Sequence, residues 1–535
     1  MRRKFFCGSI CSVISVFILM IFVLTSCDKN NVLPSGHSSI FPAENSYGLT
    51  EFELTRCLYF GDSTENLDLK EEWMKEYERL TGVKIKVNYP PRNTYRDNVN
   101  LKLASGELKG IVNFFTFTDV INAVENGFLE PLDSYLANNA NWNSMSEEYK
   151  NSYLYNGKIY AINAGYTGNF FTRIIRADWL NNLQLNIPKT VYEIYDMAKA
   201  FTENDPDRNS KNDTYGLTTS NFWLCQDIFQ AFDARLNNTG NGSIAWDPNE
   251  GAWIDSMLKP QMVDALNFMR ELYKNRYIDN DMFTNSGSVA REKLHSGKCG
   301  SIFDWAMNGY EKATKAVRDT IPEARFIEIP GITGNATQNL NQRTMGGLIY
   351  GIVKGTKYVD LVINHFVDKF LFDEKVHLAA RNGIEGKTFK LEGTTIIMQI
   401  DPQTGKPYAG AELVEPMPNF DFDKYPRIND GTIYEKEEQL SIINLKSIML
   451  QEGLNEKLLF NVPSEPYNSP QSSTYAICSA DINKIFMDAA TKAVMGETTA
   501  EEAIQEYRRK MKALGADKIL EEANQAIGKK SIQKY

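Results

Sequence analysis

Strand patterns and helical patterns alternate along the chain after residue 50. Apolar runs and apolar–polar alternation predict strands at residues 52–60, 83–89 and 111–115, and apolar positions three or four residues apart predict helices at 68–80, 95–103 and 119–125. A glycine follows each helix, at Gly82, Gly106 and Gly127, as expected for helix ends. The repeated strand-then-helix order predicts an α/β lobe with a mainly parallel sheet.

The alternation continues in a second predicted lobe, which begins near Tyr166. This lobe includes an extended helix near residues 190–202, and the apolar segment 345–352 predicts a strand that returns to the first lobe. The chain ends in helices, because Thr499–Glu502 has the sequence of a capping box and Gly515 predicts the end of the helix that follows.

Residues 1–26 have the pattern of a lipoprotein signal peptide. Residues 2–4 are basic, residues 5–24 are mostly apolar and uncharged, and Leu-Thr-Ser-Cys, ending at Cys27, resembles a lipobox. A diacylglyceryl group on Cys27 would anchor the mature chain in a membrane, since each buried CH₂ contributes about 0.8 kcal/mol. An uncleaved transmembrane helix is the alternative, because the apolar stretch is about long enough to span a bilayer. Residues 27–50 are rich in Asn, Ser, Pro and Gly and predict a flexible tether.

The net charge argues against a nucleic-acid-binding protein, and the length bounds the number of domains. The 535 residues carry a formal net charge of −10, and removal of the basic leader would leave a mature chain near −13. Such an acidic chain argues against a nucleic-acid partner, because phosphate binding requires clustered Lys and Arg. The length is sufficient for two domains that share a cleft, or for one large domain.

Four cysteines remain if the leader is removed and Cys27 is acylated: Cys57, Cys225, Cys299 and Cys478. Their wide spacing contains no zinc motif and no dense disulfide framework. Buried free thiols are the preferred interpretation, and a disulfide is the alternative for a protein outside the cell.

Several short segments occur in an order and spacing that resemble a known family. They are residues 101–107 (LKLASGE), 126–133 (NGFLEPLD), 156–160 (NGKIY), 176–180 (RADWL) and 383–387 (GIEGK). Over nearly the whole mature chain, the sequence resembles the family 1 extracellular solute-binding lipoproteins of Gram-positive ABC importers, in the branch of LplA-like and alginate-oligosaccharide-binding proteins. Asn163 departs from this family, which usually has Pro at that position, and the difference loosens a turn.

The resemblance implies an α/β protein with the two-lobe, type II periplasmic-binding-protein-like fold, in which hinged lobes surround a cleft. Lobe 1 would comprise residues 51–165 and 345–395, and lobe 2 residues 166–344 and 396–535. The resemblance further implies a monomer, tethered to the outer face of the membrane, that delivers a solute to ABC permease subunits. We expect this solute to be an oligosaccharide. A ligand that binds the closed form better would shift the population toward closure.

An acidic segment has the spacing of a calcium-binding loop. Oxygens recur at alternate positions from Asp205, and the ligands would be Asp205, Asp207, Asn209, the carbonyl of Lys211, and Asp213. Some relatives bind calcium in this loop, which supports a structural Ca²⁺, although no cofactor is required. Arg208 and Ser210 replace the family's glycines, and no Glu follows at the tenth or twelfth position. An Asn/Asp-rich turn is therefore the alternative.

Sugar recognition requires flat apolar faces and polar groups, which points to a small set of residues. Trp305 follows a predicted strand after which relatives have a sugar-stacking Trp, and Asp304 beside it could accept hydrogen bonds from hydroxyls. Trp223 opens a helix after another predicted strand. Tyr166, near the crossing between lobes, and Glu385, in a Gly-Ile-Glu-Gly turn, are further candidates. Core packing is the alternative for the tryptophans, and a solvated turn is the alternative for Glu385.

Catalytic motifs do not point to an enzyme. None of the four histidines lies in an HExxH motif, and the sequence has no G-x-S-x-G elbow, P-loop or dinucleotide fingerprint. The main alternative is a secreted glycoside hydrolase, since paired carboxylates approach in space and leave no sequence pattern. A binding protein for peptides or other solutes, or one that reports to a sensor kinase, is the third interpretation.

Overall fold

The structure is a computed structural model that describes most of the chain between residues 48 and 535. The described residues are 48–57, 67–91, 94–150, 153–164, 169–237, 239–306, 313–318, 320–334, 341–344, 348–403, 405, 407–408, 425, 427–428, 459–461 and 470–535. All of them belong to one compact unit, Ala43–Tyr535. The expected signal peptide, Cys27, most of the expected tether and Tyr166 lie outside the described residues.

The first sheet has five strands in the order β2-β1-β3-β14-β6. Its strands are β1 (Glu51–Thr55), β2 (Lys84–Asn88), β3 (Ile111–Phe114), β6 (Ala161–Asn163) and β14 (Ile349–Ile352). The predicted parallel pairing is confirmed for β1 with β2 and β3, whereas β14 runs antiparallel to both β3 and β6. The chain therefore returns to this sheet through β14, at the strand expected from the apolar segment 345–352.

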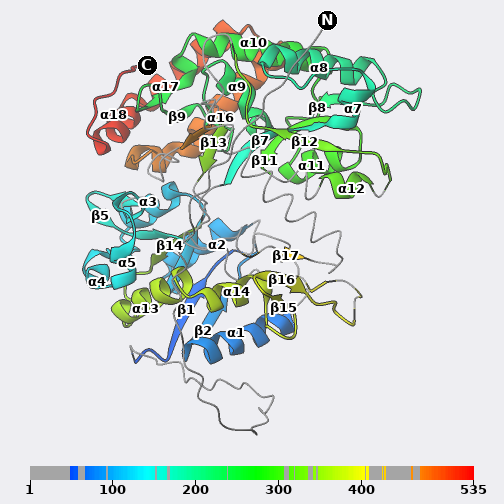
Figure 1. Ribbon diagram of the computed structural model, residues 1–535. Coiled ribbons are helices and arrows are strands. Elements are labelled where there is room, and N and C mark those ends of the chain that lie inside the picture. The colour runs from blue at the N-terminus through cyan, green and yellow to red at the C-terminus, as the bar shows by residue number, and fades with distance from the viewer. Residues whose placement is uncertain are drawn as a thin grey trace, which may run out of the picture. The chain divides into compact units, whose positions relative to one another are not determined.

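The predicted helices around this sheet are confirmed as α1 (Leu67–Thr81), α2 (Tyr95–Ala104) and α3 (Phe117–Glu125) (Figure 1). Helical segments that come later in the chain are α4 (Asp133–Leu136), α5 (Ala140–Ser144), α6 (Glu147–Lys150), α13 (Val359–His365), the π-helical turn η5 (Phe366–Leu371) and α14 (Glu374–Asn382). Trp73 and Tyr77 of α1 are fully buried and pack in the core of the first sheet. The Tyr77 hydroxyl lies 2.7 Å from Nε2 of His365, which fixes α1 against α13.

The second sheet has six strands, with the path β18-β13-β7-β11-β8 and with β12 also paired to β7. The strands are β7 (Asn169–Arg176), β8 (Tyr215–Leu217), β11 (Cys299–Trp305), β12 (Phe326–Ile329), β13 (Asn341–Thr344) and β18 (Leu459–Asn461). β11 is antiparallel to β7, with Trp305 opposite Phe171, and parallel to β8. This register decides where the candidate site residues fall.

The helices that pack around this sheet contribute to two core clusters, one that includes Trp179 and Phe201 and one that includes Leu294 and Val317. They are α7 (Ala177–Asn182), α8 (Val191–Glu203), η2 (Trp223–Cys225), α9 (Gln226–Ala231), η3 (Ser256–Leu258), α10 (Gln261–Lys274), α11 (Gly287–His295) and α12 (Lys315–Arg318). Trp179 is fully buried and packs in the core. The hairpins β4 (Leu154–Tyr155) with β5 (Lys158–Ile159) and β9 (Ile244–Asp247) with β10 (Ala252–Asp255) stand apart from the two large sheets.

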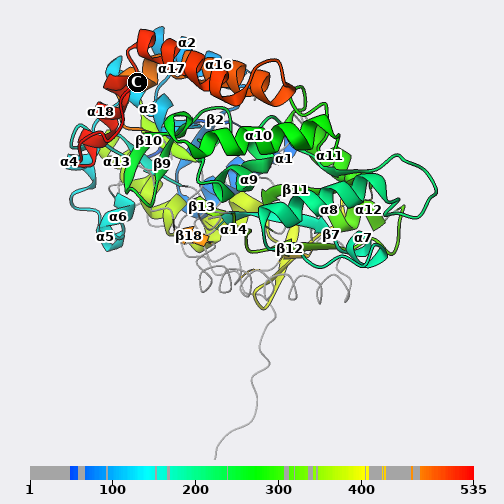
Figure 2. The ribbon, with the colours of Figure 1, turned by 90° about the horizontal axis from the view of Figure 1, so that it is seen from above.

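The chain ends in the predicted helices, α16 (Ser473–Met495), α17 (Ala500–Leu514) and α18 (Asp517–Ala526). Thr499 and Glu502 form the expected capping box, and Gly515 ends α17 in the left-handed region at φ +79°. α16 packs against α10 and α17 (Figure 2). Asn122 of α3 donates a 3.1 Å hydrogen bond to the carbonyl of Ala476 in α16, so the C-terminal helices also contact a helix of the first sheet.

A third, three-stranded sheet consists of β15 (Phe389–Glu392), β16 (Thr395–Met398) and β17 (Arg427–Ile428). The lobe boundary expected at 395/396 falls inside β16. The lobe limits as a whole stay predictions. Cys57, Cys225, Cys299 and Cys478 are free thiols; the first three are buried and Cys478 is half-buried.

Candidate sugar-binding site at the edge of the second sheet

Trp223 and Trp305 lie at the same edge of the second sheet. Trp305 is the last residue of β11, and Trp223 begins η2 shortly after β8 ends at Leu217. β8 and β11 run parallel, with Ser301 opposite Leu217, so their carboxyl ends meet at this edge. Ligands of open α/β sheets bind outside the carboxyl ends of the strands. The structure thus brings together two residues that are far apart in the sequence.

Trp305 packs on an aromatic ring of the neighbouring strand. The ring centroids of Phe171 and Trp305 lie 4.1 Å apart, at an interplanar angle of 41°. Trp223 and Trp305 are both half-buried and pack against one hydrophobic cluster, whose buried members include Leu294 and Ile302. A half-buried indole keeps part of its apolar surface for a ligand, which fits the predicted stacking role and does not test it.

Asp304 is 1% exposed and forms an ion pair with Arg291 of α11. Arg291 donates from Nε to Oδ2 and from Nη2 to Oδ1, each at 2.6 Å. Two parallel bonds of this kind fix the plane of both groups. Asp304 was predicted to accept hydrogen bonds from sugar hydroxyls, and here each of its oxygens already accepts one from Arg291. Its contact with a ligand stays a prediction, and Arg291 enters the site as a residue that the sequence did not single out.

The indole of Trp223 is fixed from several sides. The guanidinium carbon of Arg291 lies 5.4 Å from the ring centroid, within cation–π range. A Cβ at Gly287, in the first turn of α11, would lie 2.6 Å from Cζ3 of Trp223. A Cβ at Gly240 would lie 2.5 Å from the Trp223 backbone nitrogen. Two glycines thus let the surrounding chain approach this residue closely.

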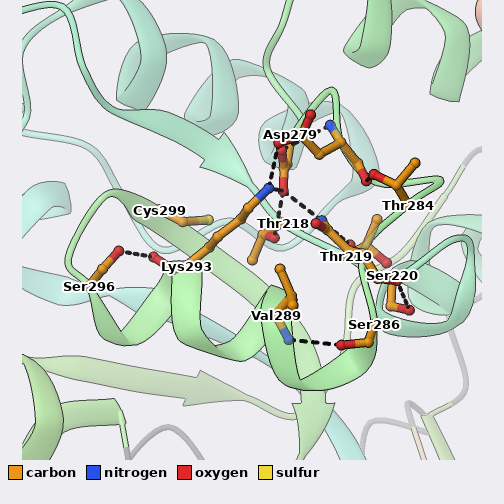
Figure 3. A network of polar contacts seen from close by, with 12 residues as sticks. Thr218, Thr219, Ser220, Asp279, Thr284, Ser286, Val289, Lys293, Ser296 and Cys299 are labelled. Carbon is orange, nitrogen blue, oxygen red and sulfur yellow. Dashed lines mark hydrogen bonds and ion pairs between the residues drawn. The ribbon is translucent and has the colours of Figure 1, made fainter.

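Asp279 connects the loop after β8 to helix α11 (Figure 3). Its Oδ2 accepts bonds from Lys293 Nζ at 2.7 Å, from Asn285 Nδ2 at 2.7 Å and from Thr218 Oγ1 at 3.3 Å. The carbonyl of Asn285 accepts a 2.7 Å bond from the Ser220 hydroxyl. Because the carboxylate is buried, these bonds hold the loop and α11 in one arrangement.

Arg173 and Asp227 form a second ion pair, which is fully buried. Arg173 of β7 donates from Nε to Oδ2 of Asp227 at 2.8 Å and also from Nη2 to Oδ1. Burial raises the pKa of Asp227, and the charge of Arg173 opposes this shift. The pair ties α9, the helix that follows Trp223, to the sheet. Neither residue stands in a recognisable motif, so pattern reasoning missed both.

Glu385 lies apart in the sequence, in an exposed turn between α14 and β15. Gly383 and Gly386 adopt positive φ values of 93° and 85°, and Gly386 donates a 2.7 Å backbone bond to Phe389. The Thr388 hydroxyl closes the turn with a 2.6 Å bond to the carbonyl of Asn382. The role predicted for Glu385 stays a prediction.

The acidic segment folds into a turn around Asn209. The backbone nitrogen of Asn209 donates to Asp205 Oδ1 at 3.0 Å, and its side-chain nitrogen donates to Asp207 Oδ2 at 2.9 Å and to Asp213 Oδ1 at 3.2 Å. Lys211 N donates to Asn209 Oδ1 at 2.7 Å. Four of the predicted calcium ligands therefore place side-chain atoms close together.

Two observations bear on whether this turn fits calcium. Arg208 and Ser210 adopt the left-handed conformation, at φ 56° and 61°, which the family's glycines would adopt without strain. No group of three or more His, Cys, Asp or Glu side chains among the described residues is arranged to hold a metal, so amide and carbonyl oxygens would have to contribute.

The missing ligand at the twelfth position has a structural cause. That position is Gly216, and a Cβ there would lie 2.4 Å from the Cα of Ala198 in α8. Close packing of β8 on α8 thus excludes any side chain at the position where an EF-hand loop carries its bidentate Glu.

The family to which the chain belongs follows from sequence comparison. The family described as bacterial extracellular solute-binding protein matches residues 61–374. The chain is a member of this family of solute-binding proteins. None of the described helices is long and apolar enough to cross a membrane.

Two curated relatives come from Bacillus subtilis (strain 168). The chain is 26% identical to lipoprotein LipO over 488 residues, which cover 86% of this chain and 90% of LipO. It is 30% identical to the polygalacturonan/rhamnogalacturonan-binding protein YtcQ over 236 residues, which cover 43% of this chain and 46% of YtcQ.

Solved structures show the fold. The alginate-binding protein AlgQ2 without calcium ion superposes with a TM-score of 0.68 at 18% identity, over 90% of this chain and 98% of AlgQ2. The substrate-binding protein FusA of Streptococcus pneumoniae, in complex with kestose, superposes with a TM-score of 0.60 at 17% identity, over 88% of this chain and 97% of FusA. The predicted fold class, the type II α/β fold of solute-binding proteins, is confirmed.

Proposed function

We propose that this protein captures an extracellular oligosaccharide between its lobes and delivers it unchanged to an ABC importer. The observation that carries the proposal is the position of Trp223 and Trp305, two half-buried indoles at the carboxyl ends of the parallel strands β8 and β11. Flat apolar faces beside polar groups are what a pyranose ring requires. Membership of the solute-binding family supports the same ligand class, and so do the polygalacturonan and rhamnogalacturonan named for YtcQ and the kestose bound to FusA.

A saccharide panel tests the ligand class. Purified protein is titrated with galacturonate oligomers, alginate oligomers, kestose and a control set of peptides, and the melting temperature is recorded. A ligand that binds the folded state alone raises this temperature. Stabilisation by one class of saccharide and by no peptide supports the proposal, whereas stabilisation by peptides alone would replace it with the third interpretation.

The proposal includes a lipid anchor on Cys27 and a position on the outer face of the membrane. The lipobox-like sequence and the lipoprotein name of LipO support it. The test combines membrane fractionation with fatty-acid labelling of cells that express the chain or its Cys27→Ala variant. We expect the parent in the membrane fraction and the variant released or retained as the unprocessed precursor. Equal lipid labelling of both chains would refute the anchor.

We further propose that residues 205–213 bind Ca²⁺ as a structural ion. The converging side chains of Asp205, Asp207, Asn209 and Asp213 support this. Bound there, the ion would neutralise the carboxylates and stiffen the connection between α8 and β8. It would take no part in chemistry at the tryptophan edge.

A further inference from the structure

Arg291 contacts both Trp223 and the residue that precedes Trp305. The guanidinium of Arg291 lies over the ring of Trp223, at 5.4 Å from its centroid. The same group donates two 2.6 Å bonds to Asp304, the residue directly before Trp305. Movement of Arg291 would therefore reach Trp223 directly and Trp305 through the end of β11.

We propose that Arg291 is a positioning residue that holds Trp223 and Trp305 in one preformed sugar-binding platform. The inference rests on the proposed function of this edge. Arg291 suits the role because its planar fork bonds a carboxylate at two points and stacks on an aromatic ring at the same time. A lysine carries the same charge but has no planar fork, so its ammonium cannot bond the carboxylate at two points while it stacks on the ring, and both indoles would be less well fixed.

The base from which Arg291 extends is itself rigid. Helix α11 is capped by the Ser286 hydroxyl, which accepts a 3.2 Å bond from Val289 N. Lys293, two residues beyond Arg291, donates to Asp279 at 2.7 Å in the network of Figure 3. Gly287 in the first turn brings the α11 backbone against the Trp223 ring. A side chain that positions another must start from a fixed backbone, and these contacts supply one.

The protein contains the same combination of groups at the C-terminal end of β7, away from the end where Phe171 pairs with Trp305. Arg176 donates to Asp178 at 2.9 and 2.6 Å, and its guanidinium lies 4.6 Å from the ring centroid of Trp179. Trp179 is 0% exposed, so this second combination serves the core. Arg176 is five residues along β7 from Phe171, about 17 Å at the rise of an extended strand. It is a matched control for Arg291.

The test uses ¹⁹F NMR of protein labelled with 5-fluorotryptophan, without ligand. The signals of Trp223, Trp305 and Trp179 are assigned from Trp→Phe variants at each position. We expect Arg291→Lys to shift or broaden the signals of both Trp223 and Trp305. We expect Gly287→Ala, whose Cβ would lie 2.6 Å from the Trp223 ring and 3.4 Å from Nη1 of Arg291, to shift Trp223. Arg176→Lys should shift Trp179 and leave the other two unchanged.

Titration with trigalacturonate and kestose completes the test. We expect Arg291→Lys to weaken binding of the recognised sugar at least fivefold, and to add nothing in a Trp223→Phe, Trp305→Phe background. Unchanged Trp223 and Trp305 signals in Arg291→Lys would overturn the positioning role, and so would movement of Trp223 alone. If neither sugar perturbs these signals in the parent protein, the result counts against the proposed sugar ligands. The ligand-free NMR spectra of Arg291→Lys still decide the positioning role.

Discussion

Arg291 and Asp304 join α11 to the end of β11 through two hydrogen bonds of 2.6 Å each. Burial would lower the pKa of Arg291, but the hydrogen bonds and charge of Asp304 outweigh burial and raise it. The raised pKa keeps the Arg291 guanidinium charged beside Asp304. The sequence gives no direct sign of this ion pair, because the two residues stand on different elements.

Replacement of Asp304 by Asn should destabilise the protein. It leaves the Arg291 charge without its counter-charge, and the loss of one partner from a buried pair costs about 3–5 kcal/mol. The Arg291 side chain is 26% exposed, so hydration should limit the loss in free energy of unfolding to about 2 kcal/mol. Urea unfolding measures this. The control is Glu506→Gln, which breaks the exposed ion pair of Glu506 with Arg509, and an equally small loss in both variants would contradict the pairing of Asp304 with Arg291.

Truncation of either tryptophan should weaken sugar binding without unfolding the protein. We expect Trp305→Ala and Trp223→Ala each to raise the dissociation constant at least tenfold, which corresponds to about 1.4 kcal/mol. Trp246→Ala is the control, because Trp246 is also half-buried but lies on β9 and packs against Trp253. Isothermal titration calorimetry with the sugar found in the panel gives the constants. An equal effect of all three substitutions would place the site elsewhere.

Sequence patterns predicted the elements of the fold better than the site. Apolar spacing identified α1, α2, α3 and β1–β3, because packing against a sheet imposes a period on neighbouring residues. The antiparallel direction of β14 left no such trace, since it depends on where a distant segment returns. Trp223 and Trp305 were recognisable because each stands near the carboxyl end of a predicted strand.

The residues that position these tryptophans were not predictable, because their contacts also depend on distant segments. Arg291 lies on a helix surface, where an arginine is ordinary, and its role arises only when Asp304 meets it in space. Asp279 and Gly287 likewise gain meaning only from the approach of α11 to the loop after β8. Local sequence records periodicity, whereas ion pairs between elements depend on tertiary contact.

Two buried histidines should make stability fall in mild acid. Burial lowers the pKa of His365 and of His377 to about 4. The unfolded chain, with a histidine pKa near 6.5, then binds more protons between about pH 4 and 6.5, so stability is complete above that window and falls as the pH decreases through it. Each histidine should cost on the order of 2 kcal/mol at pH 5. Urea unfolding of the parent and of His377→Gln at pH 7.5 and 5 measures how much of the loss in free energy of unfolding comes from His377. An equal loss in both proteins would exclude a contribution from His377.

Calcium should stabilise the protein if residues 205–213 bind it. At a concentration one hundred times the dissociation constant, a ligand of the folded state adds about 2.7 kcal/mol to stability. We expect Ca²⁺ to raise the melting temperature of the EDTA-treated protein, and Asp205→Asn with Asp207→Asn to abolish the increase. An equal increase in parent and variant would locate the ion elsewhere, and no increase in the parent would leave the segment as an Asn/Asp-rich turn.

Native mass spectrometry with an oligosaccharide mixture tests the central claim most directly. The account predicts a one-to-one complex that releases the saccharide at its original mass, and a Trp305→Ala variant in which this complex is depleted. Absence of any saccharide complex, or release of shortened products during incubation, would contradict a protein that binds a sugar and returns it intact.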